Sequence, residues 1–138
     1  MTDPQERAVV GAHLDAVGRL VLPAIEATFA DDVELVPPYA PPGFPKVSRG
    51  RAAAMEVHPE GLMDPVRFSD HRIDALEGRP GEWLAEYTSD TRVLTTGRPY
   101  RNTCISRFSI RNGRITRLAE FSDPIVPVTA LGPEVPTS

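Results

Sequence analysis

The chain has 138 residues, of which 41% are hydrophobic and 25% charged, and this balance argues against a wholly disordered, collagen-like or coiled-coil protein. One domain spanning residues 1–138 is expected, able to bury roughly 68% of the surface that the unfolded chain exposes. The net charge of −4 leaves no basic field for nucleic acid or an anionic membrane surface. No apolar run has the length of a membrane span, and the polar start MTDPQER lacks the features of a signal peptide, which favours a cytoplasmic protein.

The first part of the chain predicts three helices and one short strand. Asp3 and Pro4 can begin a helix whose apolar residues recur at helical spacing through Val17. A second short helix is expected from about Pro23 to Phe29, followed by the strand VELVP, which two prolines stop. After a proline-rich loop, the stretch GRAAAMEVH contains strong helix formers and predicts the third helix.

From Val66 onward the pattern is that of long strands. Four of them are expected, in VRFSDHRIDALEG, GEWLAEYTSDTRVLTTG, RPYRNTCISRFSIRNG and GRITRLAEFSDP, and the pair Asn112-Gly113 predicts a tight hairpin between the last two. Helices followed by antiparallel strands indicate an α+β fold in which helices cover one concave face of a curved sheet. The proline-rich end, from about residue 124, is expected to be an extended tail.

Four stretches, in this order and spacing, resemble the SnoaL-like family of the nuclear-transport-factor-2-like superfamily: FADDVELVPPYAPPGFP, TGRPYRN, RNGRI and AEFSDPIVPVTALG. The last is similar to the EF-x-NP ending of the phenazine-biosynthesis A/B proteins. The resemblance covers nearly the whole chain. It implies a cone-shaped sheet with three N-terminal helices closing a pocket, a small-molecule ligand and a homodimer. The superfamily contains isomerases, cyclases, dehydratases, epoxide hydrolases and non-catalytic binders, so the fold alone names no reaction.

Two activities of the superfamily lack their residues in this chain. Ketosteroid isomerases have a catalytic Asp, a Tyr donor and an Asp donor at positions that match Pro37, His13 and the neighbourhood of Ser106. Limonene epoxide hydrolases have an Arg and an Asp where this chain has Tyr87 and Ser89. Steroid isomerisation is therefore disfavoured, because proline offers no side-chain base.

At the position of Glu120, this chain has a carboxylic acid, as the related enzymes do. Glu120 matches an Asp of the last strand in limonene epoxide hydrolases and a Glu implicated in acid/base chemistry in phenazine A/B proteins. Alternation along ITRLAEFSDP places Glu120 on the face of Leu118, opposite a face that includes Ile115. A carboxyl in an apolar pocket has a raised pKa, which lets it donate as well as accept a proton near neutral pH. The residues alone leave open a solvated carboxylate paired with Arg72, Arg107 or Arg117.

Further candidates follow from the same alternation and from the resemblance. One strand should turn Trp83, Ala85 and Tyr87 inward, and the next should turn Asn102, Cys104, Ser106 and Phe108 inward. His58 approximately matches a His of the phenazine proteins, although a helix-end partner is the competing interpretation. The candidate ligand-binding residues are His13, Tyr39, Trp83, Tyr87, Asn102 and Ser106. We expect Asp123 to cap or turn the chain, His71 to be exposed, and Cys104, the single cysteine, to be a small buried hydrophobe.

These residues together predict a cofactor-free cyclase, isomerase or dehydratase of secondary metabolism, acting on a polyketide-like or other cyclic metabolite. Glu120 and His58 are the candidate catalytic residues, and no metal site is expected. Two alternatives remain at this stage. One is a non-catalytic binder of a hydrophobic metabolite, and the other is an epoxide hydrolase that keeps Glu120 as the base for water.

Overall fold

The fold places four helices around one sheet in a computed structural model that describes residues 3–57 and 65–131. The helices are α1 (Asp3–Arg19), α2 (Leu22–Thr28), α3 (Arg51–Glu56) and α4 (Ile125–Leu131). The strands are β1 (Phe29–Val36), β2 (Ser48–Arg49), β3 (Arg67–Ala75), β4 (Glu82–Arg92), β5 (Pro99–Arg111) and β6 (Arg114–Ser122). The three helices and the four long strands expected from the sequence are present. Within the described residues, no helix is long and apolar enough to cross a membrane.

The strands form one six-stranded sheet in the order β2-β1-β6-β5-β4-β3. Strands β3 to β6 are antiparallel to their neighbours, as predicted. Strand β1 lies beside β6 and runs parallel to it, so the sheet as a whole is mixed. Local patterns could not reveal this pairing, because β1 and β6 come from opposite ends of the chain.

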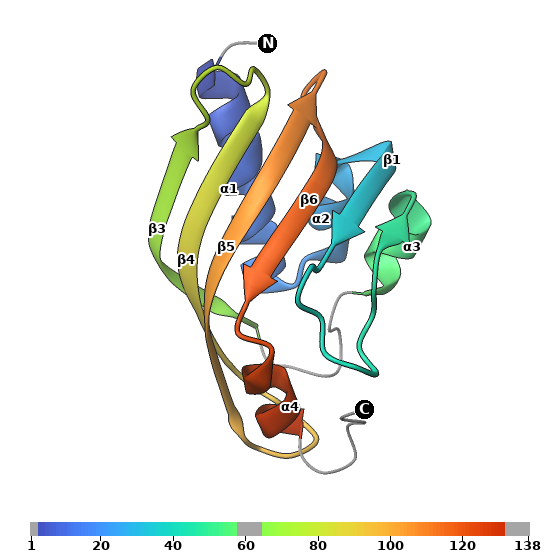
Figure 1. The fold of residues 1–138 in the computed structure, drawn as a ribbon, viewed down its shortest axis with the longest axis vertical. Helices are drawn as coiled ribbons and strands as arrows, with labels where there is room; N and C mark the ends of the chain where they lie inside the picture. The colour runs from blue at the N-terminus through green and yellow to red at the C-terminus, as the bar shows by residue number, and fades with distance from the viewer. Residues whose placement is uncertain (1–2, 58–64, 132–138) are drawn as a thin grey trace.

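One face of the sheet is covered by helices and the other is not. Figure 1 shows α1 and α2 behind the strands, whereas the face toward the viewer carries no helix. We name these the inner and the outer face. Val10 and Leu14 of α1 and Ile25 of α2 are buried with Phe108 and Leu118 of the sheet in the hydrophobic core. Each such side chain contributes about 1.5–3 kcal/mol on burial, which holds α1 on the inner face as predicted.

The strand registers decide which side chains share the inner face. Ala85 opposes Ser106, and Tyr87 opposes Cys104. Ser106 in turn opposes Glu120 of β6. The prediction that Glu120 lies on one face with Trp83, Tyr87, Asn102 and Ser106 is therefore confirmed.

A β-bulge in β6 makes the expectation that Ile115 and Leu118 lie on opposite faces wrong. Ile110 opposes Ile115 and Ser109 opposes Arg117, so Thr116 is an extra residue in β6. The bulge reverses the alternation, and Ile115 joins Leu118 on the inner face, where it is fully buried. The tight turn before it is as expected, since Asn112 and Gly113 have φ values of 52° and 78°, which suit a hairpin turn.

The expectation of an extended tail from residue 124 is also wrong, because Ile125–Leu131 form α4. Pro127 lies in the first turn of this helix, where its missing N–H breaks no helical bond. The Asp123 carboxylate accepts a hydrogen bond from the Ile125 N–H at 2.9 Å, so Asp123 has the predicted capping role. At the other end, Thr96 and Arg98 of the β4–β5 turn donate to the carbonyls of Ala130 and Thr129.

Candidate functional site

The chemistry of the inner face changes along the strands. Three rows of side chains cross β4, β5 and β6: Trp83, Phe108 and Leu118, then Ala85, Ser106 and Glu120, then Tyr87, Cys104 and Ser122. The first row is apolar and lies under α1, whose His13 ring is 5.7 Å from the Phe108 ring. Polar groups begin in the second row. The inner face is thus a packed core at one end and a polar site next to it.

A chain of hydrogen bonds joins Ser106, Tyr87 and Glu120. The Tyr87 hydroxyl lies 2.7 Å from the Ser106 hydroxyl and also bonds to the Glu120 side chain. Burial and the nearby charge of Glu120 raise the pKa of Tyr87 well above its usual value, whereas the bond from Ser106 lowers it. Either hydroxyl of the Tyr87–Ser106 pair can be the donor. The Tyr87 hydroxyl can donate to the Glu120 carboxylate, which only accepts.

Glu120 is the acidic end of this chain. Burial raises the pKa of its carboxyl, and the hydrogen bond from Tyr87 partly lowers it again. Glu120 is nevertheless one of the solvent-exposed residues of the protein. Protein atoms therefore surround the Glu120 carboxyl on the inner face, while part of the residue remains accessible to solvent.

The arginines proposed as partners for Glu120 bind other carboxylates. Arg72 pairs with Glu86 at 3.5 Å, Arg107 with Glu82 at 3.1 Å, and Arg117 with Glu34 at 4.0 Å. The cross-strand register places Arg72, Glu86 and Arg107 on the outer face, away from Glu120. The expected pairing of Glu120 with one of these three arginines is therefore wrong.

Two more proton donors surround the same carboxyl. Burial raises the pKa of Tyr100 to about 12, although a hydrogen bond with Asn102 lowers it. Burial and the charge of Glu120 raise the pKa of the Cys104 thiol, also to about 12. Both groups keep their protons at neutral pH, so Cys104 is a buried thiol with no thiolate character, as expected. Tyr100 can donate a hydrogen bond. It was not among the residues named from the sequence, although its position two residues before Asn102 on β5 predicts that both side chains lie on the same face.

Asn102 holds the end of β6 against β5. Its Nδ2 donates to the Asp123 carbonyl at 3.1 Å, and its Oδ1 accepts from the Asp123 N–H at 3.0 Å. The pair reproduces a backbone ladder and fixes the start of α4. The structure thus gives this amide a structural task beside the site.

Two other candidates lie beneath the site, in the core. The buried His13 has its Nδ1 3.0 Å from the Thr28 hydroxyl, and its ring packs on Phe29 at 5.3 Å. Trp83 donates from Nε1 to Glu6 at 2.9 Å. Both side chains support the inner face from the α1 side.

The remaining candidates lie elsewhere. Tyr39 is 61% exposed and its ring lies 5.6 Å from that of Phe121, which opposes Ile105 on the outer face. His58 lies outside the described residues. His71 is exposed, as expected, but its ring lies 6.4 Å from that of Tyr87. Sequence alternation did not show this position, because it results from a bulge in β3.

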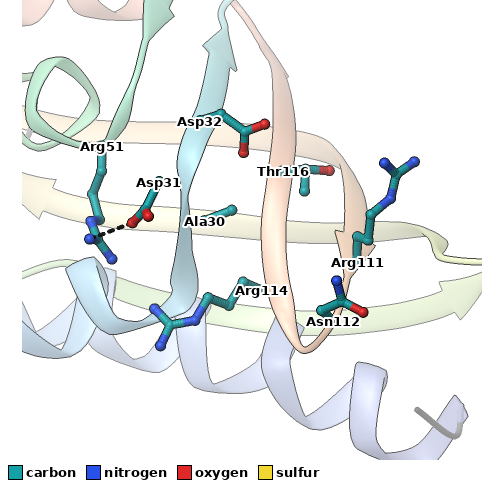
Figure 2. Close-up of a pocket in the computed structure, with 8 residues that line it drawn as sticks. All are labelled: Ala30, Asp31, Asp32, Arg51, Arg111, Asn112, Arg114 and Thr116. Atoms are coloured by element: carbon teal, nitrogen blue, oxygen red, sulfur yellow. Dashed lines mark ion pairs between the residues drawn. The ribbon is translucent and has the colours of Figure 1, made fainter.

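A polar hollow of about 670 Å³ lies away from Glu120, at the start of β1 and the β5–β6 hairpin (Figure 2). Two of its arginines have partners in the protein. Arg51 pairs with Asp31 at 2.5 Å, and Arg114 donates to the Phe29 carbonyl at 3.4 Å. Within the described ranges, no group of three or more His, Cys, Asp or Glu residues could hold a metal ion.

A curved sheet with helices on one face defines the class of α+β small-domain proteins with a nuclear-transport-factor-2-like fold. The sequence profile of the SnoaL-like domain matches residues 10–118, which is more than half of the chain. The chain belongs to this SnoaL-like family. The matched region ends two residues before Glu120, so the profile itself does not include that carboxyl.

Known proteins agree with this family and fold. The uncharacterized protein YesE of Bacillus subtilis is 31% identical over 103 residues, 69% of this chain and 65% of that protein, so the match spans less than two thirds of the relative. A Bacillus subtilis structure named as a candidate isomerase shares 24% identity with a TM-score of 0.86, covering 96% of both chains. A Xanthomonas campestris structure named as a candidate polyketide cyclase shares 21% identity with a TM-score of 0.79, covering 94% of this chain and 98% of that one.

Proposed function

We propose that the protein is a cofactor-free cyclase, isomerase or dehydratase of a polyketide-like or other cyclic metabolite, with Glu120 as its general acid/base. The observation that carries the proposal is the Glu120 carboxyl itself. It has a pKa raised by burial, receives a hydrogen bond from Tyr87, and keeps a surface that a ligand can reach. The names of the similar structures, isomerase and polyketide cyclase, agree with this class of reaction.

The arrangement suits reactions that move a proton between two atoms of one substrate. As a carboxylate, Glu120 takes a proton from a carbon or hydroxyl of the ligand, and as a carboxylic acid it returns that proton at another atom. A raised pKa brings both forms close in free energy near neutral pH. Tyr87 stabilises the carboxylate form by donating to it, and Ser106 holds the Tyr87 hydroxyl in place. Such a cycle needs no electron transfer.

A non-catalytic binder of a hydrophobic metabolite is the second candidate. It is favoured because several residues that were predicted to contact the ligand bind other protein groups. Asn102 binds the Asp123 backbone, His13 lies against Thr28, and Trp83 donates to Glu6. Epoxide opening has less support, since Tyr87 and Ser89 occupy the positions of its Arg and Asp.

Native mass spectrometry of the purified protein separates the two candidates. We expect a small cyclic compound to co-purify and to be converted, with no change in mass for an isomerase or cyclase and with the loss of one water for a dehydratase. Chromatography of the released compound before and after incubation detects the isomers. A ligand that stays chemically unchanged through long incubation would support the binder and contradict the enzyme.

We also propose that the chain forms a cytoplasmic homodimer through the outer face. Figure 1 shows this face without a helix, and Ile105 at its centre is 39% exposed beside Phe121. Its charged residues pair within the face, as Arg107 does with Glu82, so a second copy meets little net charge.

Sedimentation equilibrium tests the dimer. The native protein should sediment as a dimer at micromolar concentration, and Ile105→Lys should shift it to the monomer by burying an unpaired charge. Leu94→Lys is the control, because Leu94 is also exposed, at 51%, but lies in the β4–β5 turn. A monomeric native protein, or an Ile105→Lys dimer of unchanged strength, would contradict this interface.

A further inference from the structure

A bulge in β3 changes the face on which His71 lies. Ser69 opposes Thr88 and Arg72 opposes Glu86, so residues 70 and 71 of β3 face the single residue Tyr87 of β4. Regular alternation would put His71 on the same face as Ser69. With one extra residue, the strand turns and the imidazole reaches the side of Tyr87.

His71 belongs to a cluster of three rings on the inner face. Its ring centroid is 6.4 Å from that of Tyr87 at an interplanar angle of 89°, and 6.4 Å from that of Phe68. The rings of Phe68 and Tyr87 are themselves 4.9 Å apart at 65°. Tyr87 makes edge-to-face contacts with Phe68 and His71, and the contact between Phe68 and His71 is tilted. Together they orient the imidazole and form an aromatic wall beside Tyr87, the hydrogen-bond partner of Glu120.

Among the described residues, the side-chain nitrogens of His71 have no hydrogen-bond partner, whereas the hydroxyl of its neighbour Tyr87 is hydrogen-bonded. The Tyr87 hydroxyl forms hydrogen bonds with Glu120 and with Ser106. Within residues 3–57 and 65–131, His71 makes ring contacts but no hydrogen bond or ion pair, and its side chain is exposed. A neutral imidazole offers one donor and one acceptor nitrogen. An oriented ring with free nitrogens, beside a reactive carboxyl, is suited to contact a ligand.

We propose that His71 is a ligand-contacting residue of the Glu120 site, which binds a hydroxyl or carbonyl oxygen of a planar ring compound while the ring of that compound lies against the partly exposed ring of Phe68. The inference rests on the proposed function, since it assigns a further residue and a ligand class to the same site. Glu120 and His71 then contact the ligand from either side of Tyr87. Planar rings with oxygen substituents are the ligand class that this wall and these two groups fit.

Binding of two small probes tests the role of His71. Naphthalene offers only the ring, and 2-naphthol adds one hydroxyl. We expect the native protein to bind 2-naphthol more tightly, by about 3- to 10-fold, which is the net effect of one hydrogen bond. His71→Phe keeps a ring but removes both nitrogens, so it should abolish this preference and leave naphthalene affinity unchanged. Arg72→Gln, next in the chain but paired with Glu86 on the outer face, should behave as the native protein.

Nuclear magnetic resonance adds a direct observation. The imidazole nitrogen resonances of His71 should shift on addition of 2-naphthol to the native protein and to Glu120→Gln. A preference for 2-naphthol that survives in His71→Phe, or that is absent from the native protein, would overturn the role of His71. If that preference is lost only in Glu120→Gln, the proposed site stands without His71. If the native protein binds neither probe, both the ligand site and the inference are wrong.

Discussion

The Glu120→Gln variant should lose turnover by at least about 10²-fold while its affinity for the ligand changes little. Glutamine has the size of glutamate, and its amide oxygen can still accept the hydrogen bond from Tyr87. It cannot take up and return a proton. The measurement is conversion of the co-purified ligand by the native protein and the variant, with binding followed separately by calorimetry.

Asp123→Asn is the matched control for this experiment. It is also a carboxyl-to-amide change, only three residues away, but the Asp123 side chain caps α4 through the Ile125 N–H. Asparagine caps helices about as well as aspartate, so fold and turnover should be kept. An active Glu120→Gln variant would exclude Glu120 as the acid/base, and an inactive Asp123→Asn variant would show that amide substitution near the end of β6 is damaging in itself.

Alternation in the sequence was sufficient to place most of the candidate site. Strands β4 and β5 pair without interruption, from Glu82 opposite Ser109 to Arg92 opposite Pro99. Every second residue of each strand therefore lies on the face that a period of two predicts. Glu120 could be placed because it follows the β6 bulge and keeps the parity of Leu118. The hairpin at Asn112-Gly113 was predictable for a local reason, the positive φ of both turn residues.

The parts that the sequence did not predict depend on events without a local pattern. A single extra residue in each strand moves Ile115 and His71 to the opposite face of the sheet from the one that alternation predicts. Nothing in the sequence of either strand marks where such a bulge will form. The choice of partner for each arginine depends on cross-strand register, which puts Arg72 beside Glu86. Helix α4 needs Thr96 and Arg98 from a distant turn to bind its last carbonyls. Proline content alone therefore gave an extended tail.

The burial that raises the pKa of Glu120 should also appear in the stability of the protein. Its carboxyl has a pKa above the usual range because of burial, whereas the unfolded chain exposes a glutamate with a pKa of about 4.3. Between these two pKa values the folded protein holds a proton that the unfolded chain has released. The free energy of unfolding of the native protein therefore falls as pH rises through this window, and the loss stays constant above the folded pKa.

The Glu120→Gln variant carries no such group, so its Tm relative to that of the native protein should rise with pH across the same window and level off above it. Near pH 4 the two proteins should differ least, and at neutral pH the variant should be the more stable. Carboxyl infrared titration of the native protein reports the same pKa directly. Glu77→Gln, in the exposed β3–β4 turn, controls for the loss of one negative charge.

Tyr87→Phe sharpens the test, because the hydrogen bond from Tyr87 lowers the pKa of Glu120. Its removal should move the infrared transition of Glu120 to still higher pH. A Tm difference between the native protein and Glu120→Gln that is independent of pH, with a carboxyl that titrates in the ordinary range, would mean that water solvates Glu120 fully.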